Sequence, residues 1–175
     1  IWYDEYLKGN LDAILSNTSG CGTTMKDYGF IFRDDKKMKK KAKKISELTK
    51  DVSEYLSENL NLKFKKKEKK LRIAYHSACS MQHGQKVHSQ PIELLSKTNN
   101  EIMEIPEGHI CCGSAGTYNI LQTKIAKELL KKKVNNIESL KPDFISTGNI
   151  GCITQISNGT QTPILHTIEV LDWYT

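Results

Sequence analysis

The sequence predicts an α/β fold: a Rossmann-like, mainly parallel sheet with flanking helices. Short apolar segments of strand length alternate along the 175 residues with longer segments whose apolar residues recur at helical spacing. Strands separated by helices are typical of parallel sheets, because a parallel pair needs a crossover connection. Four of the five cysteines follow a predicted strand or open a predicted helix. The pattern that predicts the fold therefore also places the reactive groups.

The first third of the chain is expected to contain one strand followed by lysine-rich helices. Residues 12–17 form a short apolar strand that leads to Gly20-Cys21-Gly22. In the helical region that follows, one apolar face is expected to consist of Ile45, Leu48, Val52, Tyr55, Leu56 and Leu60. The polar and charged residues 61–70 predict a linker.

The rest of the chain predicts four further strands, at residues 71–75, 101–105, 143–146 and 164–165. Residues 91–95 are expected to form a short helix. A long helix should run from the loop after Gly116 to about Leu140. Its expected apolar face consists of Ile120, Leu121, Ile125, Leu129, Leu130, Val134 and Ile137. A last helix is expected to be capped near Thr167.

A segment near the start of the chain is repeated near its end. Five residues recur at an offset of 131 positions: Asp12, Ile14, Gly20, Cys21 and Thr23 match Asp143, Ile145, Gly151, Cys152 and Thr154. Such self-similarity indicates an internal repeat. We therefore expect residues 1–60 to be the C-terminal part of a first repeat plus linking helices, and residues 61–175 to be a complete second domain. Cys21 would then be an orphan ligand of the first repeat.

Cys79, Cys111, Cys112 and Cys152 are the candidate metal ligands. The carboxyl ends of parallel strands meet at one edge of a sheet, so these thiols should converge there. Thiolates are the form that binds metal, and clustered thiolates repel one another unless a cation neutralises them. Five cysteines, two of them adjacent, fit a disulfide framework poorly.

Spacing alone leaves three occupants of this site open. Adjacent cysteines are natural for an iron–sulfur cluster, which has several metal atoms. Structural zinc sites generally use short Cys-x-x-Cys knuckles, which the sequence lacks. Buried or redox-active free thiols are the third alternative. A thiol-dependent enzyme that uses Cys79 or Cys112 with His76 would leave the other cysteines unexplained.

Other residues are candidates for supporting roles at the site. His76 would position the cysteine loop or tune it through a hydrogen bond, and His166 ends a strand at the same edge of the sheet. Gly113 lets the backbone approach closely, and donation from glycine N–H groups to sulfur raises the reduction potential of a cluster. A structural role is the alternative for both histidines. The polar loop residues are expected to include His83, His88 and His109.

The net charge of +6 comes mainly from lysines in residues 36–44 and 63–70. Such runs can bind nucleic acid or anionic lipid. No aromatic side chains interleave with them in the way that base stacking requires. We interpret the lysines as a solvated helix face and a linker, and we expect no nucleic-acid partner. No apolar run approaches the ~20 residues that span a bilayer.

The cysteines lie in blocks of sequence that resemble a known family. The blocks contain His76-Ser-Ala-Cys79, Cys111-Cys112-Gly113, Gly151-Cys152 and His166-Thr-Ile-Glu169. In this order they resemble the C-terminal cysteine-rich CCG domain of glycolate oxidase iron–sulfur subunits, which is related to the CCG-containing subunit of heterodisulfide reductase. The resemblance covers essentially the whole chain, because Ser19-Gly-Cys21-Gly is similar to the end of the first CCG repeat in that family.

The resemblance implies an iron–sulfur electron-transfer subunit of a glycolate oxidase complex. Its ligands would be Cys79, Cys111, Cys112 and Cys152, and its cofactor a 4Fe-4S cluster of cubane or noncubane type. The implied partners are flavin-containing subunits and an N-terminal ferredoxin-like domain of the same parent chain, with electrons passing toward a quinone or another acceptor. The implied location is cytoplasmic or peripheral on the inner face of the membrane. The fragment alone would not be catalytic.

One position departs from the family pattern. The second cysteine of the closing Cys-x-x-Cys pair would fall at position 155, where this chain has Gln155. With four thiols in place of five, an ordinary four-iron cluster or zinc becomes an alternative to the noncubane type. The alternative function is accordingly a structural zinc-binding or subunit-interaction module of a related 2-hydroxy acid or glycerol-3-phosphate oxidising complex.

Overall fold

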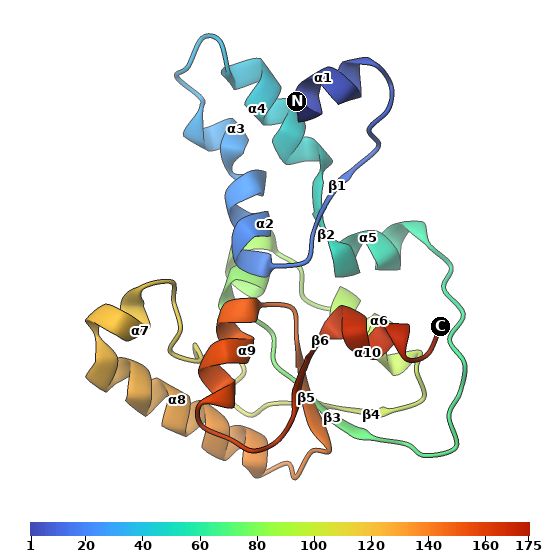
Figure 1. The fold of residues 1–175 in the computed structure, drawn as a ribbon, viewed down its shortest axis with the longest axis vertical. Helices are drawn as coiled ribbons and strands as arrows, with labels where there is room; N and C mark the ends of the chain where they lie inside the picture. Colours follow the sequence, from blue (N-terminus) through green and yellow to red (C-terminus); the bar gives the residue numbers. More distant parts are fainter.

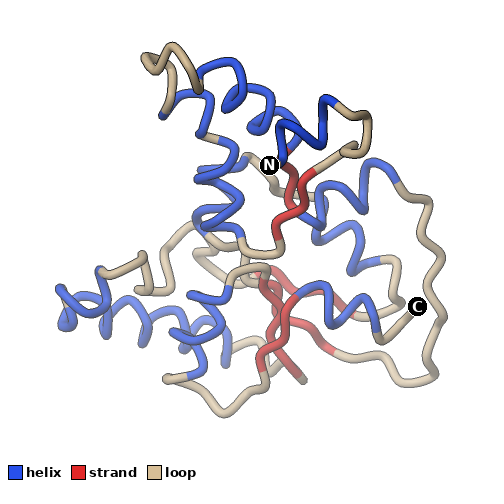
Figure 2. The backbone as a smooth tube through the Cα atoms, turned by 45° about the horizontal axis from the view of Figure 1, so that its top comes forward, coloured by secondary structure: helices blue, strands red, loops and turns tan.

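The computed structural model describes residues 1–175 and confirms the predicted α/β class. Its centre is a four-stranded parallel sheet of order β4-β3-β5-β6. These strands are β3 (Arg72–Tyr75), β4 (Glu101–Glu104), β5 (Phe144–Thr147) and β6 (Ile164–His166). Helices lie on either side of the strands (Figures 1 and 2). They are α6 (Gln90–Ser96), α7 (Tyr118–Leu121), α8 (Thr123–Glu138), α9 (Ile150–Ser157) and α10 (Thr167–Asp172).

The N-terminal part contributes a second, two-stranded parallel sheet made of β1 (Ile14–Ser16) and β2 (Thr49–Asp51). Its helices are α1 (Trp2–Leu7), α2 (Ser19–Lys26), α3 (Tyr28–Ile31), α4 (Lys39–Leu48) and α5 (Val52–Asn59). Helices α1, α3 and α4 lie at the far end from the four-stranded sheet, and α2 reaches toward it (Figure 1). No helix combines the length and apolar character that crossing a bilayer requires.

The two faces of the central sheet are buried in separate cores, because side chains alternate along each strand. Ala74 and Ile145 join a core that also contains Cys112 and Cys152. Ile73 and Phe144 point the other way, into a core shared with α6 and α10. The cysteines are therefore packed on one face only, the face that α8 and α9 cover.

The register of the strands reproduces the sequence repeat. Ser16 lies opposite Asp51 in the small sheet, and Thr147 lies opposite His166 in the large one. Ser16 and Thr147 stand at the same offset as Cys21 and Cys152. Helices α2 and α9 have the same length of eight residues and place these cysteines at the same helical position. The structure thus contains the same strand–helix corner twice.

A hydrogen-bond network joins the two corners. The Ser19 hydroxyl lies 2.7 Å from the Ser80 hydroxyl and accepts a 2.7 Å hydrogen bond from the Asn149 amide. The Ser19 N–H donates to the Gly148 carbonyl at 3.2 Å. Ser80 begins the π-helical turn η1 (Ser80–Gln85), which packs against α2. The start of the first corner is thereby fixed against the start of the second.

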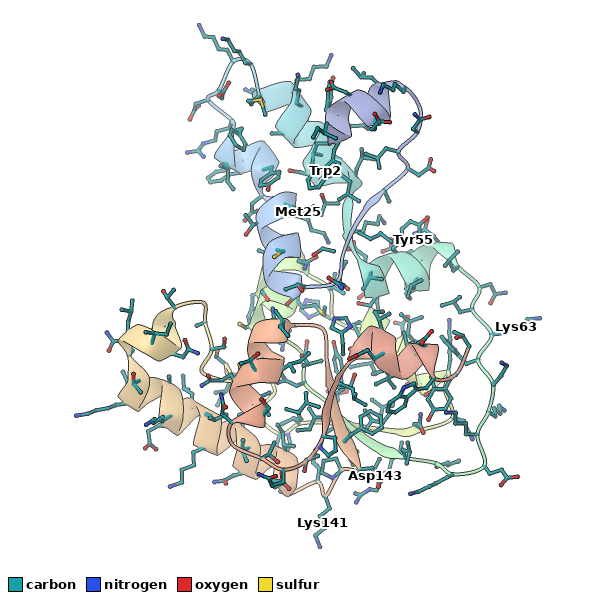
Figure 3. The ribbon with its side chains drawn as sticks, viewed as in Figure 1. Trp2, Met25, Tyr55, Lys63, Lys141 and Asp143 are labelled. Atoms are coloured by element: carbon teal, nitrogen blue, oxygen red, sulfur yellow. The ribbon has the colours of Figure 1, made fainter.

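Several predicted elements have different boundaries in the structure. The expected apolar helix face from Ile45 to Leu60 is interrupted by β2, which the sequence pattern did not predict. Thr49 and Asp51 are buried there, so tertiary pairing with β1 overrides the helical spacing. The π-helical turn η1 was also not predicted. The expected linker, residues 61–70, contains no helix or strand, and Lys63 projects outward from it (Figure 3).

The prediction of one long helix after Gly116 is also wrong for the first part of that helix. The structure divides it into α7 and α8, with Gln122 between them. Ile120, Leu121 and Ile125, expected on the buried face, are 74%, 73% and 52% exposed. The buried residues of α8 instead begin at Ala126 and include Val134 and Ile137. The apolar residues of α7 therefore form a surface rather than part of the core.

Asp51 is the N-cap of α5 and is 1% exposed. One carboxylate oxygen accepts a 2.9 Å hydrogen bond from the Ser53 N–H, and Glu54 closes the capping box by accepting from the Asp51 N–H at 3.1 Å. The other carboxylate oxygen is buried without a partner. Burial raises the pKa of Asp51, although the hydrogen bonds from Ser53 and the charges of Lys26 and His166 oppose this effect.

We expect Asp51→Asn to become more stable relative to the wild type as pH rises from about 4 to about 7. The folded-state pKa lies above the unfolded value, so the favourable contribution of Asp51 is fully present below the unfolded pKa and is lost as pH rises through the folded pKa. Asparagine keeps the N-cap without the charge. Urea unfolding of both proteins across this range measures the difference, and a difference that does not change with pH would contradict the prediction.

Candidate metal centre

The four predicted cysteine ligands line one cavity of about 370 Å³. Cys79 directly precedes η1, Cys111 and Cys112 lie in the loop between β4 and α7, and Cys152 lies in the first turn of α9. The structure therefore brings together thiols that are up to 73 residues apart, from Cys79 to Cys152. Cys21 lines the same cavity from α2. The expected orphan of the first repeat thus faces the site of the second.

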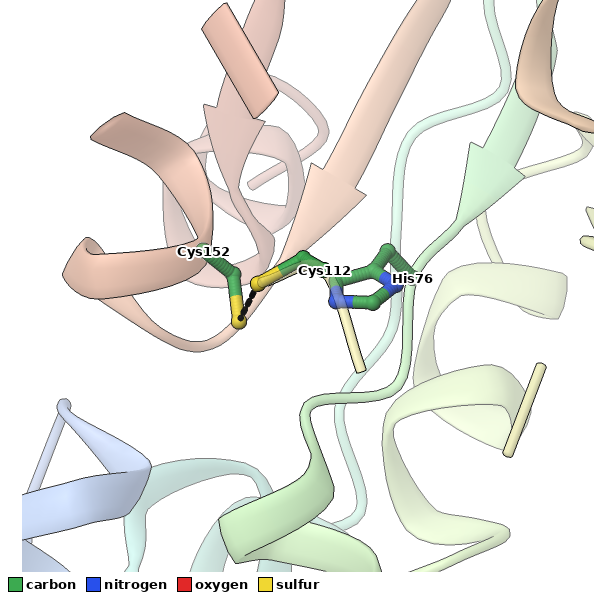
Figure 4. Close-up of side chains that lie close together, drawn as sticks. All are labelled: His76, Cys112 and Cys152. Carbon is green, nitrogen blue, oxygen red and sulfur yellow. Dashed lines mark hydrogen bonds between the residues drawn. The ribbon is translucent and has the colours of Figure 1, made fainter. Parts of the chain in front are cut away.

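The sulfur atoms of Cys112 and Cys152 are 3.4 Å apart, and both side chains are buried (Figure 4). Cys79 and Cys111 are half-buried, and none of the cysteines is in a disulfide. The Gly113 N–H donates a 3.3 Å hydrogen bond to the Cys111 sulfur. The site therefore combines close thiols with backbone donation to sulfur, the kind of contact that tunes thiolate-bound metals.

Asn149 sets the position of Cys152. It is the N-cap of α9, and its side-chain oxygen accepts a 3.1 Å hydrogen bond from the Cys152 N–H. The same amide group donates to Ser19 of the first corner. Cys152 consequently lies at the positive end of a helix dipole, where the thiolate form is favoured.

The third residue of the Cys111-Cys112-Gly113 motif must be glycine for two geometric reasons. Gly113 has a φ of +94°, which side-chain-bearing residues rarely adopt. A Cβ atom there would lie 2.4 Å from the Ala126 carbonyl oxygen of α8. The glycine therefore lets the cysteine loop press directly on the helix behind it.

The four thiols cannot all ionise in this arrangement. The pKa of Cys111 is lowered, because the adjacent Cys112 and Cys79 thiols and the Gly113 N–H favour its thiolate form. The pKa of Cys152 is lowered to about 5, first by a hydrogen bond from Cys112 and then by His76. The pKa values of Cys112 and Cys79 are raised, chiefly because each lies beside Cys111, whose ionised sulfur favours a protonated neighbour. Protons thus separate neighbouring thiolates, and a bound cation would replace those protons.

His76 lies directly against the thiols. Its ligand nitrogen and the sulfur atoms of Cys112 and Cys152 all lie within 4.8 Å of one another (Figure 4). The side chain is buried, and its Nδ1 atom has no hydrogen-bond partner. A buried histidine beside two thiols is a candidate ligand of a metal bound there, or a hydrogen-bond donor to one of its ligands.

His166 has the structural placement that the sequence left open beside a role at the site. Its Nε2–H donates to the Asn17 carbonyl at 2.7 Å, and its Nδ1 accepts from the Ile168 N–H at 3.1 Å. It does not line the thiol cavity. His166 instead caps α10 and links it to the first corner. Gln155, where the family pattern has a cysteine, is buried, and its oxygen accepts a 3.1 Å hydrogen bond from Asn119.

The donor set fits a thiolate-bound metal group. Four sulfurs and one imidazole nitrogen are soft or borderline ligands, which suit an iron–sulfur cluster or zinc better than a hard cation. His76 does not line the thiol cavity itself, but one of its ring nitrogens lies within 4.8 Å of the Cys112 and Cys152 sulfur atoms.

Lys133 also belongs to this site, although the sequence pattern did not single it out. Its side chain is 1% exposed, in the part of α8 that packs against the thiol core. A signal was present, because Lys133 is three residues from Leu130 and four from Ile137, both on the expected apolar face. A charged residue inside such a face is a candidate for an electrostatic role.

Comparison with known proteins gives consistent matches. Residues 73–157 match the family profile of the cysteine-rich domain named CCG. Over 95% of its length the chain is 36% identical to the glycolate oxidase iron–sulfur subunit of Escherichia coli K12, and it covers 40% of that protein. It is 25% identical over 92% of its length to lactate utilization protein A of a Geobacillus strain, covering 70% of that protein.

A third similar protein is the probable glycolate oxidase iron–sulfur subunit of Bacillus subtilis 168. The identity is 27% over 87% of this chain, which covers 35% of that protein. The chain thus spans well under half the length of the two glycolate oxidase relatives.

We expect Gly113→Ala to destabilise the chain by roughly 3 kcal/mol or more, because it combines a strained φ with a clash against backbone. Gly116→Ala is the matched control: Gly116 also has a positive φ, of +64°, but nothing lies within 4 Å of the added Cβ. Its cost should be about 1–2 kcal/mol. Chemical denaturation measures both. Equal losses of stability in the two variants would show that the close approach of the loop to α8 is not what requires glycine at position 113.

Proposed function

Because residues 73–157 belong to the CCG family of cysteine-rich domains, we propose that this chain is part of an iron–sulfur electron-transfer subunit that serves the oxidation of a 2-hydroxy acid. The observation that carries the proposal is the convergence of four cysteines from three loops on one cavity. Relatives named as glycolate oxidase iron–sulfur subunits and lactate utilization proteins support the hydroxy acid context.

Cys79, Cys111, Cys112 and Cys152 would hold the cluster, which supplies single-electron transfer when bound. Four thiolates suit an ordinary 4Fe-4S cluster, and a noncubane cluster is the variant that the CCG family also offers. The Gly113 N–H hydrogen bond would stabilise charge on the Cys111 sulfur. His76 would support Cys152, whose sulfur it approaches. Burial of Cys112 and Cys152 keeps water from the inner side of the site.

We further propose the wider setting of this electron-transfer protein. Its electrons would come from a flavin-containing subunit and pass toward a quinone or another acceptor, with a ferredoxin-like domain in the same parent chain. The protein would work in the cytoplasm or at the inner face of the membrane. Residues 61–175 would form a complete CCG domain and residues 1–60 the end of a first one. The duplicated strand–helix corner supports this division.

A structural zinc site is the second candidate. One observation favours it: the donor atoms of His76, Cys112 and Cys152 are already close enough to share a single ion. Cys79 or Cys111 would then complete a four-ligand site, since structural zinc is tetrahedral. In that case the chain would be an interaction module, and electron transfer would belong to other domains.

Iron, zinc and acid-labile sulfide in protein purified without oxygen test the two candidates. We expect roughly four irons and a similar amount of sulfide per chain, with visible absorption that bleaches on reduction. Cys112→Ser should lose the iron, because Cys112 is buried at the centre of the thiols. Cys21→Ser is the matched control and should keep it, because Cys21 is exposed and comes from the first corner.

One zinc per chain without sulfide would replace the first candidate with the second. Metal content that Cys112→Ser leaves unchanged would reject both.

A further inference from the structure

The ammonium group of Lys133 is buried without a carboxylate partner. The side chain is 1% exposed, and its Nζ donates one 3.2 Å hydrogen bond to the Glu107 carbonyl oxygen. The carboxylate of Glu107 pairs instead with the neighbouring Lys132 at 2.7 Å and accepts from Asn136. Buried lysines without a partner are rare, because removing the charge from water is costly. Lys133 therefore needs a compensating negative charge nearby.

The thiol site is a source of such charge. The pKa of Lys133 is lowered, because burial outweighs the opposing effect of the charges of Cys112, Cys111, Cys152 and Glu107. Lys133 lies on the α8 face whose neighbours Val134 and Ile137 pack in the same core as Cys112 and Cys152. The lysine thus belongs to the part of α8 that packs on the core of the thiol site, and it does not line the cavity itself.

We propose that Lys133 is the charge-balancing cation of the thiol site, and that its buried charge raises the reduction potential of the group bound there. The inference rests on the proposed iron–sulfur function. Net charge and burial are among the properties that set cluster potentials. Reduction adds negative charge to the site, so a fixed buried ammonium stabilises the reduced form more than the oxidised form. Lys133 is a positioning residue in this sense, since it acts on the cluster without binding it.

A purely structural role is the competing explanation. The hydrogen bond to the Glu107 carbonyl ties α8 to the segment that leads into Cys111. If that bond were the whole function, loss of the charge would change stability but not the reduction potential. Two substitutions separate these roles: Lys133→Met removes the charge and the donor, whereas Lys133→Gln removes the charge but keeps a donor.

Lys132→Met is the matched control. Lys132 carries the same charge one residue away, but its side chain is 51% exposed, so solvent screens it. We expect both Lys133 variants to lower the equilibrium constant for one-electron reduction of the bound cluster about tenfold, which is about 59 mV. Lys132→Met should shift the potential by much less. The measurement is a redox titration followed by visible absorption and electron paramagnetic resonance.

The outcomes separate the inference from the proposed function. A wild-type chain that takes up no iron under anaerobic reconstitution rejects the proposed function and this inference with it. A wild-type chain with a cluster, together with Lys133 variants of unchanged potential, rejects the inference alone. A shift in Lys133→Met that Lys133→Gln restores also overturns it, because the hydrogen bond rather than the charge would then be responsible. If Lys133→Met does not fold, the reduction potential of Lys133→Gln alone tests the inference, with the same expected loss.

Discussion

Repulsion among neighbouring thiolates is the constraint on which this structure depends. Four cysteines line one cavity at the end of a parallel sheet, and Cys112 donates a 3.4 Å hydrogen bond to Cys152. Their proximity lowers the pKa values of Cys111 and Cys152 and raises those of Cys79 and Cys112. Such an arrangement is stable only with protons or a metal between the sulfurs. Two neighbouring backbone features also stabilise thiolate charge. The start of α9 favours the charge on Cys152, and Gly113 donates to Cys111.

The fold brings the four cysteines together with little unusual backbone geometry. Parallel strands put their carboxyl ends together, so three consecutive loops meet without long excursions. The exceptional element is the cysteine loop, where Gly113 allows close contact with α8. The buried residues Val134 and Ile137 of the same helix pack in one core with Cys112 and Cys152. Gly113 therefore governs how closely the cysteine loop packs on α8.

Much of the fold and of the site follows from local sequence. The four strands of the central sheet are short apolar segments, and the cysteine positions after them follow from the parallel order of the strands. Strand β2 could not be predicted, because its residues continue the helical spacing of Ile45 and Leu48 and only pairing with β1 makes them extended. The exposure of Ile120 and Leu121 could not be predicted for the same reason: periodicity identifies a helix face but not whether another element covers it.

For a related reason, the sequence identified some of the site residues but not the contacts of others. A cysteine can be identified as a candidate ligand by its residue type alone. The roles of His166 and Lys133 depend on which way one side chain points. His166 stands at a strand end, as expected, but its ring turns to Asn17 of the first corner. Lys133 was not singled out, because it is one of five lysines in α8 and most of these are exposed.

The hydrogen bonds of Ser19 with Asn149 and Gly148 join the two halves of the cavity wall. They place the cavity at the boundary between two separately paired sheets, with Cys21 on one wall and Cys152 on the other. Parting the walls would break the hydrogen bonds of Ser19, Thr23 and Gln85 and the packing of α2 on η1, but no strand pairing. The closure of the cavity therefore depends in part on Ser19, which precedes Cys79 by 60 residues.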